Sequence, residues 1–190
     1  MPVDQRMTLS ELYMVLPFYM QEQKQDMWCW AATTVSVAEL YNPLSTQTQC
    51  NLATEIFRLP TSERTNRGPT TPLSNDQSCC DAQTNCNFGY VYGLALDFLA
   101  YPNTHFVGIK TIIECNNELK NWRPVQVSIM HPPNFTMGHS VILSGVYLEG
   151  EKRKVVINDP WSGIKVMDFE KLKVSDSGSK WMYTTTSKAS

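Results

Sequence analysis

Apolar residues recur at helical spacing in the first third of the chain. Trp30, Val37 and Tyr41 lie on one face of a segment without Gly or Pro, which predicts a helix from about residue 30 to residue 41. This helix should end before Pro43, because a proline restricts the residue before it and cannot continue the hydrogen-bond pattern.

Three more helices are expected before the strand region. Thr46 and Gln49 have the spacing of a capping box, which predicts a second helix through Leu59. Its expected inward-facing residues are Cys50, Ala53, Ile56 and Phe57. A third helix should run roughly over 90–100 and a fourth over about 111–121.

The second half of the chain has short runs of apolar and β-branched residues. The expected strands cover residues 125–130, 140–148, 154–159, 164–169 and 180–187. Helices come first and strands afterwards, so the predicted fold class is α+β rather than alternating βαβ units.

Two segments lack this regularity. Residues 1–20 are expected to form a short arm or a helix, and the polar segment 60–87 a long loop with Cys79, Cys80 and Cys86 at its far end. A loop of this length is usually functional, disordered or covalently tied down. At 190 residues the chain should still form one domain with a hydrophobic core.

Composition excludes several classes of protein. Sixteen basic and 18 acidic residues give a formal net charge of −2, and no basic run indicates nucleic-acid binding. No apolar run approaches the length that crosses a bilayer. The N-terminus, with Asp4, Arg6 and Pro17, is a poor secretory signal. We therefore expect a protein that is secreted or injected without a recognisable signal, or one that stays in the cytoplasm.

Cys29 stands where a polar, glutamine-rich segment becomes the first helix. Asp26 is placed to accept hydrogen bonds from the first free backbone amides of that helix. Unpaired N–H groups and the helix dipole favour negative charge at this position, and a thiolate is the form that attacks carbonyl carbon. Most free cysteines are structural, but a polar approach is a poor way into a core. The sequence therefore favours a nucleophile.

Of the three histidines, His139 is the one with a carboxylate in reach. It opens the expected strand 140–148, and a turn near Glu149 leads into the strand that ends at Asp159. With the tip at Glu149, the two residues lie opposite each other, with Cβ atoms ~5 Å apart. Asn158 is the alternative to Asp159 as the partner of His139, but Pro160 favours an extended backbone at Asp159. His105 and His131 have no such partner.

Three sequence pieces in this order resemble the papain-like cysteine peptidases. They are Gln23 six positions before Cys29-Trp30-Ala31-Ala32, then Gly138-His139, then Asp159-Pro160-Trp161. The likeness is greatest to the bacterial branch related to the avirulence protease that plant pathogens inject into host cells. It implies a papain-like fold, with an N-terminal helical half packed against a C-terminal antiparallel sheet.

The resemblance also implies roles for individual residues. Cys29 would be the nucleophile, His139 the base, Asp159 the residue that orients the imidazole, and Gln23 an oxyanion donor. Most papain relatives have Asn in place of Asp159, whereas the bacterial branch shares the Asp. Trp161 stands where such enzymes place a tryptophan that shields the Asp–His bond, although an ordinary core tryptophan explains it equally well.

The expected substrate cleft lies between the helical half and the sheet. Trp28 and Gly138 are candidates for its wall, whereas Trp30 is expected to pack the helix. The loop 132–138 before His139 belongs to the rim, and residues 130–140 contain no Lys, Arg, Asp or Glu. We therefore expect a small or apolar residue before the scissile bond.

The remaining cysteines allow three interpretations. In the favoured one, Cys50 pairs with one of Cys79 and Cys80, and Cys86 pairs with the other. The bacterial branch often has a similar cysteine pattern. A zinc site is the second, but adjacent cysteines lack the spacing that converges on one ion. Five reduced thiols, with Cys115 among them, are the third.

Together these features predict a cysteine endopeptidase that forms a thioester acyl-enzyme. We expect a monomer that acts on protein or peptide, without a cofactor, a metal, nucleic acid or membrane insertion. Two alternatives stay open: a peptidoglycan amidase or transglutaminase-like transferase on the same residues, and a disulfide-stapled binding module whose site is inactive.

Overall fold

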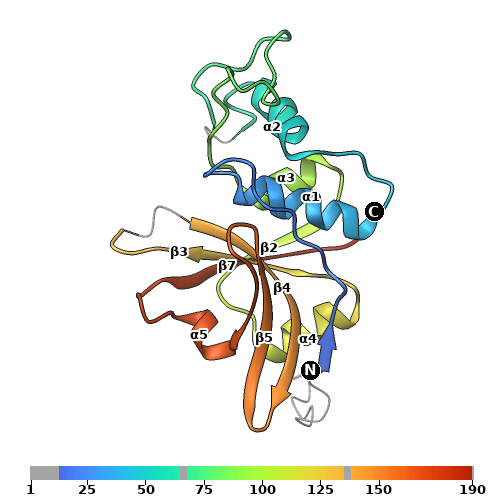
Figure 1. Ribbon diagram of the computed structural model, residues 1–190, viewed down its shortest axis with the longest axis vertical. Helices are drawn as coiled ribbons and strands as arrows, with labels where there is room; N and C mark the ends of the chain where they lie inside the picture. Colours follow the sequence, from blue (N-terminus) through green and yellow to red (C-terminus); the bar gives the residue numbers. More distant parts are fainter. Residues whose placement is uncertain (1–12, 65–67, 135–137, 190) are drawn as a thin grey trace.

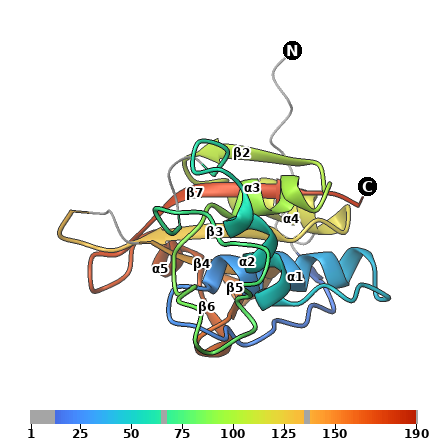
Figure 2. The same cartoon turned by 90° about the horizontal axis from the view of Figure 1, so that it is seen from above.

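The computed structural model describes residues 13–64, 68–134 and 138–189 (Figure 1). Its helices are α1 (Cys29–Tyr41), α2 (Gln49–Arg58), α3 (Tyr92–Phe98), α4 (Ile112–Lys120) and α5 (Phe169–Lys173). Helices α1, α2 and α3 lie together at one end of the molecule, and α2 and α3 both contact α1 (Figures 1 and 2). The other end consists of the sheet with α4 and α5 beside it (Figure 1).

The sheet has seven strands and only antiparallel pairs among the described residues. They are β1 (Tyr13–Val15), β2 (Asn103–Val107), β3 (Val125–Met130), β4 (Gly138–Glu149), β5 (Lys152–Asp159), β6 (Gly163–Asp168) and β7 (Lys180–Ser187). Their order is β2-β7-β3-β4-β5-β6, and β1 pairs with the C-terminal half of β4. The predicted α+β class is confirmed.

The expected caps differ from those found. α2 begins after Thr48, whose side chain accepts a hydrogen bond from the Asn51 N–H, so the prediction of Thr46 as the cap was wrong. Thr48 has the extended backbone that an N-cap requires. The fourth helix has a complete capping box between Thr111 and Glu114.

Three elements were not expected from the sequence: β1, β2 and α5. β2 is an exposed edge strand that pairs along its length with β7, and α5 is a single short turn of helix. None is long enough to establish a periodic pattern. Residues 1–12 of the expected N-terminal arm lie outside the described part, whereas 13–15 form a strand rather than a helix.

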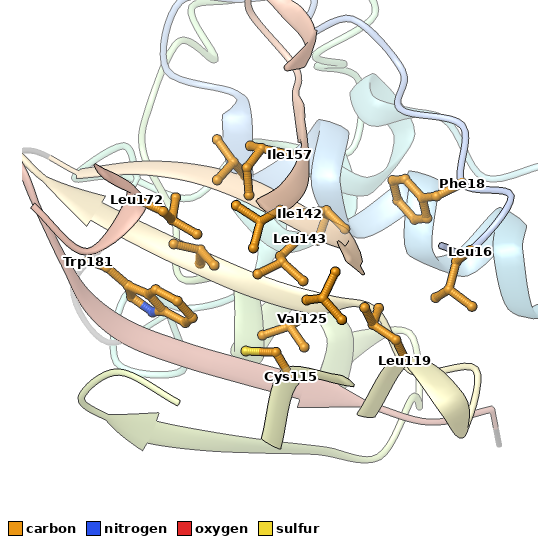
Figure 3. Close-up of a cluster of buried hydrophobic side chains, with 14 of the residues drawn as sticks. Leu16, Phe18, Cys115, Leu119, Val125, Ile142, Leu143, Ile157, Leu172 and Trp181 are labelled. Carbon is orange, nitrogen blue, oxygen red and sulfur yellow. The ribbon is translucent and has the colours of Figure 1, made fainter. Parts of the chain in front are cut away.

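Two separate hydrophobic clusters stabilise the fold. Figure 3 shows the larger one, where Cys115 and Leu119 of α4 face Val125, Leu143 and other residues of the sheet. The smaller cluster joins α1, α2 and α3 to the cysteine-rich loop. Its members include Trp28, Trp30, Leu52, Ala53, Ile56, Phe57, Cys79 and Cys86.

Two disulfides connect this loop. One joins Cys50 of α2 to Cys80, and the other joins Cys79 to Cys86. Cys29 and Cys115 are free. The structure therefore has the two disulfides rather than the zinc site or the five reduced thiols that were the alternatives. Of the two adjacent cysteines, Cys80 is the one bonded to α2.

Candidate active site

Cys29 is the first residue of α1, so its backbone N–H has no carbonyl partner inside the helix. The N-cap residue is Trp28, and no side chain caps this helix end. The expectation that the Asp26 side chain would do so was wrong. Asp26 instead accepts a hydrogen bond from Gln23 Nε2 at its backbone carbonyl, 2.9 Å away.

The two tryptophans beside Cys29 are both 1 % exposed. Trp28 Nε1 donates to the Cys86 carbonyl at 2.7 Å, and Trp30 Nε1 donates to the Phe88 carbonyl at 3.0 Å. The placement of Trp28 in the wall of the cleft was therefore wrong. Both indoles fasten the start of α1 to the cysteine-rich loop and leave Cys29, which is partly exposed, at the surface.

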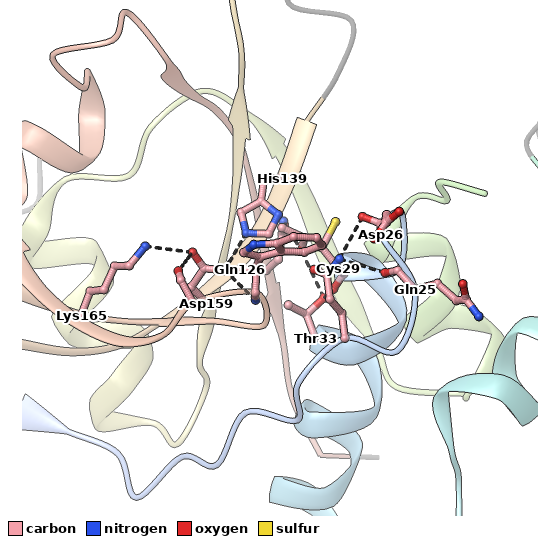
Figure 4. A network of polar contacts seen from close by, with 12 residues as sticks. Gln25, Asp26, Cys29, Thr33, Gln126, His139, Asp159 and Lys165 are labelled. Atoms are coloured by element: carbon pink, nitrogen blue, oxygen red, sulfur yellow. Dashed lines mark hydrogen bonds and ion pairs between the residues drawn. The ribbon is translucent and has the colours of Figure 1, made fainter. Parts of the chain in front are cut away.

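His139 connects Cys29 to Asp159 (Figure 4). Its Nε2 lies 2.7 Å from Asp159 Oδ1. That leaves Nδ1 for the hydrogen bond with Cys29, which is one of the interactions that raise the pKa of His139. The side chains of His139 and Asp159 are 23 % and 11 % exposed, so the pair is largely protected from solvent.

The electrostatics of the pair favour an ionised state. Burial alone would lower the pKa of the His139 imidazole, but hydrogen bonds with Asp159 and Cys29 and the negative charge of both raise it to about 9. Burial would raise the pKa of the Asp159 carboxyl, but hydrogen bonds from His139 and Ser162 hold it well below its usual range. At neutral pH an imidazolium therefore lies between a carboxylate and the sulfur.

The register of β4 and β5 differs from the one expected. Their turn is at Gly150, because Glu149 pairs with Lys152. An extra residue, Ser144, shifts the register between Leu143 and Gly145, and beyond it Ile142 faces Asn158. Extended by one position, this register places Val141 opposite Asp159. His139 therefore reaches Asp159 diagonally rather than directly across.

The extra residue decides which face His139 occupies. Without it, Asp159 would be opposite Ile142, on the other face of the sheet from His139, because side chains alternate with a period of two. A β-bulge commonly redirects a side chain in this way next to a functional site. The predicted contact between His139 and Asp159 is present, but the predicted register was wrong, because the sequence did not reveal the bulge.

The side-chain amide of Gln23 is engaged by the loop that leads to Cys29. Nε2 donates to the carbonyls of Gln25 and Asp26, both at 2.9 Å, while Oε1 is buried and without a partner among the described residues. The backbone N–H of Gln23 donates to the Pro160 carbonyl. One of the two side-chain bonds must open before this amide can donate to a bound group.

The structure also describes the other residues that the sequence suggested for the site. Asn158 is 1 % exposed and donates from Nδ2 to Ser144, whereas His139 Nε2 bonds with Asp159. Trp161 is 62 % exposed, which excludes the core alternative, and its backbone N–H donates to Asp159 Oδ1 at 2.9 Å. Gly138 is exposed and begins β4.

The two remaining histidines have other hydrogen-bond partners. His105 contacts Thr185, and His131 contacts Ser179. Of the loop 132–138, residues 135–137 lie outside the described part of the chain.

Sequence reasoning missed two groups that hold Asp159. Ser162 donates to Asp159 Oδ2 at 2.5 Å, and Lys165 Nζ lies 3.2 Å from the same oxygen. The spacing Asp-x-x-Ser after a strand is a signal that a turn will fold back onto the carboxylate.

A buried polar network beneath the site was also not anticipated. Thr33 Oγ1 donates to the Cys29 carbonyl at 2.8 Å and shares a hydrogen bond with Ser140 Oγ at 3.1 Å. Gln126 Nε2 donates to Ser140 at 3.0 Å. Since Ser140 follows His139, this network joins the helix that carries the sulfur to the strand that carries the imidazole.

Comparisons with known proteins identify the family of this chain. A family model described as the Peptidase_C39 like family matches residues 15–189. The chain belongs to this family. It is therefore a member of a papain-like cysteine peptidase family, which is the coarser part of the resemblance seen in the sequence.

The fold of this C39-like chain has a counterpart among solved structures. A Bacillus anthracis protein, provisionally described as a C39-like peptidase, has a TM-score of 0.55 and 19 % sequence identity. The match covers 94 % of this chain and 98 % of the other. No curated protein matches the chain. Within the described residues, the helices are too short or too polar to span a bilayer.

Proposed function

We propose that the chain is a cysteine endopeptidase in which Cys29 is the nucleophile, His139 the general base and acid, and Asp159 the residue that orients the imidazole. The observation that supports this most is the position of His139, which bonds with Cys29 through one ring nitrogen and with Asp159 through the other. A nucleophile, a base and an orienting carboxylate in series are what acyl transfer requires.

The proposed reaction has two stages. The Cys29 sulfur attacks the substrate carbonyl carbon, and a C–S bond forms. The C–N bond then breaks as His139 gives its Nδ1 proton to the leaving amine, which leaves a thioester. A water gives one proton to His139, attacks the thioester carbonyl, and the C–S bond breaks to return the thiolate and the imidazolium.

The oxyanion of each tetrahedral intermediate needs donors close to the sulfur. The backbone N–H of Cys29 has no partner within α1 and is the first. Gln23 is the second, after one of its bonds to the carbonyls of Gln25 and Asp26 has opened. We assign to Trp161 the role of covering the bond between His139 and Asp159 from solvent.

The substrate we propose is an extended peptide with a small or apolar residue before the scissile bond. Its support is the segment 130–138 before His139, which contains no Lys, Arg, Asp or Glu. The disulfides favour an oxidising compartment, and with the order of the sequence motifs they support a secreted or injected bacterial protease of effector type.

The direct test is cleavage of a proteome-derived peptide library by the wild type and by Cys29→Ala, with sequencing of the new termini. The wild type should produce new termini with a small or apolar residue before the cut, it should cut unfolded proteins at more sites than folded ones, and a thiol-directed epoxide should block it. Cleavage of muropeptides only, or amine incorporation without hydrolysis, would replace the endopeptidase by an amidase or a transferase. No thiol-dependent reaction at all would favour the inactive binding module.

A further inference from the structure

Gln49, the first residue of α2, is 2 % exposed and directs its side-chain amide at the loop before Cys29. Its Oε1 accepts a hydrogen bond from the Lys24 N–H at 3.0 Å, and its Nε2 donates to the Glu22 carbonyl at 2.8 Å. These two backbone groups belong to the residues on either side of Gln23. The amide of Gln49 thus pairs with this stretch of backbone as a neighbouring strand would.

Gln49 also ties this stretch to α1. Its Nε2 lies 3.1 Å from Gln21 Oε1. The backbone N–H of Gln21 donates to Ser36, and its side chain donates to Glu39, both on α1. The loop is therefore fixed against both helices at its beginning.

The rest of the loop has few anchors of its own. Residues 24–27 are exposed, and Met27 is held by the bond from its N–H to Asn87 Oδ1 at 2.8 Å. Between the two ends, the Gln23 N–H donates to the Pro160 carbonyl. Gln49 thus holds the backbone on both sides of Gln23, and the Pro160 carbonyl holds Gln23 itself.

We propose that Gln49 is a positioning residue for Gln23, which keeps that side chain beside the sulfur of Cys29 where an oxyanion forms. The inference rests on the proposed function, in which Gln23 is an oxyanion donor. Gln49 does not contact the reacting atoms. It fixes the backbone from which the donor projects, and small misplacements of such groups are costly to the rate.

The test begins with Gln49→Met, which keeps the length of the side chain and removes its hydrogen bonds to Gln21, Glu22 and Lys24. We expect kcat to fall roughly ten- to a hundredfold with KM nearly unchanged, because the donor acts on the transition state and not on the bound substrate. Gln47→Met is the matched control: the Gln47 side chain donates to Glu55 of α2 rather than to the loop, so kcat should stay at the wild-type value.

A double-mutant cycle separates positioning from a general loss of structure. In a Gln23→Ala background, Gln49→Met should have little further effect on kcat, because the donor that it positions is gone. A merely structural residue would lower kcat by the same factor in both backgrounds, and that result would overturn the inference. Should Gln49→Met not fold, Gln49→Glu serves, since it keeps the acceptor for Lys24 and loses the donor to Glu22.

The outcomes also separate this inference from the proposed function. Wild-type kcat in Gln49→Met, together with inactive Cys29→Ala and impaired Gln23→Ala, overturns the role of Gln49 alone. Full activity in Gln23→Ala overturns both the donor role of Gln23 and the role of Gln49. Activity in Cys29→Ala overturns the proposed function itself. A faster amide exchange at Lys24 in Gln49→Met supports the inference independently of catalysis.

Discussion

Asn158 Nδ2 lies 2.6 Å from Ser144 Oγ, at the point where β4 carries one residue more than β5. Both side chains are almost fully buried. The amide therefore holds the extra residue in place from the neighbouring strand. Asn158 and Asp159 are adjacent in sequence, yet one holds the bulge and the other receives the histidine that the bulge redirects.

Deletion of Ser144 should move His139 to the other face of the sheet and away from Asp159. We expect the protein to lose activity by roughly 10³-fold or more, as when the base of a catalytic triad is removed. Ser144→Ala keeps the residue count and loses only the hydroxyl, so its activity should stay within a few fold. The measurement is kcat/KM together with far-UV circular dichroism. An active, folded deletion variant would contradict the assigned register.

The three central residues should differ in their contributions. Cys29→Ala should abolish hydrolysis and His139→Ala should cost nearly as much, whereas Asp159→Asn should cost less because an amide can still orient the ring. His105→Ala and His131→Ala are the controls, since these rings contact Thr185 and Ser179 rather than Asp159. Initial rates on one peptide substrate compare all five. A His131→Ala enzyme as impaired as Cys29→Ala would mean that the base has been misassigned.

The pH dependence should report the raised pKa of His139. We expect kcat/KM to fall as the pH rises through about 9, where the imidazolium loses the proton that the leaving amine needs. Asp159→Asn removes a negative charge that raises this pKa, so the fall should move to lower pH. A pH–rate profile that is unchanged by Asp159→Asn would argue against this coupling.

The same shift predicts the pH dependence of stability. A group whose pKa is higher in the folded than in the unfolded state stabilises the fold fully below the unfolded value, which is about 6.5 for histidine. The contribution of His139 is then lost as the pH rises through about 9. Urea unfolding of wild type and His139→Ala at pH 6 and pH 9.5 measures it: the difference in unfolding free energy should shrink at the higher pH.

Loss of the disulfide between Cys50 and Cys80 should destabilise the fold. These cysteines are 30 positions apart, and closing a loop of that size is worth about 3–4 kcal/mol in the chain-entropy model. Cys50→Ser/Cys80→Ser should show this loss in urea unfolding, whereas Cys115→Ala removes a thiol and leaves both disulfides. Thiol titration of the denatured, unreduced protein should give two groups. Four or more free thiols would contradict the presence of both disulfides.

Regular elements with a long apolar pattern could be read from the sequence. The helix that starts at Cys29 and the five strands from Val125 onward were predicted close to their observed bounds. Their patterns are set by burial, which local sequence records directly. β2 was missed because its partner, β7, is about 80 residues away, so its formation depends on a pairing that no local pattern records.

The site could be predicted only as far as residue types and spacing allow. The proximity of His139 and Asp159 followed from the hairpin, but the bulge at Ser144 did not, since an extra residue in a strand has no apolar signature. Trp28 was misjudged for a related reason. Its position beside Cys29 suggested the cleft, whereas its burial depends on a loop about 58 positions further along the chain, with which it shares a hydrogen bond.

The two disulfides differ in how far solvent reaches them. Cys80 is exposed, whereas Cys79 and Cys86 are 6 % and 3 % exposed. An exposed disulfide is the more readily attacked by an external thiol, so the bridge to Cys50 should open first. Cys50 directly follows Gln49, whose side chain forms hydrogen bonds with the loop before Cys29. Reduction of this bridge should therefore also loosen the loop before Cys29.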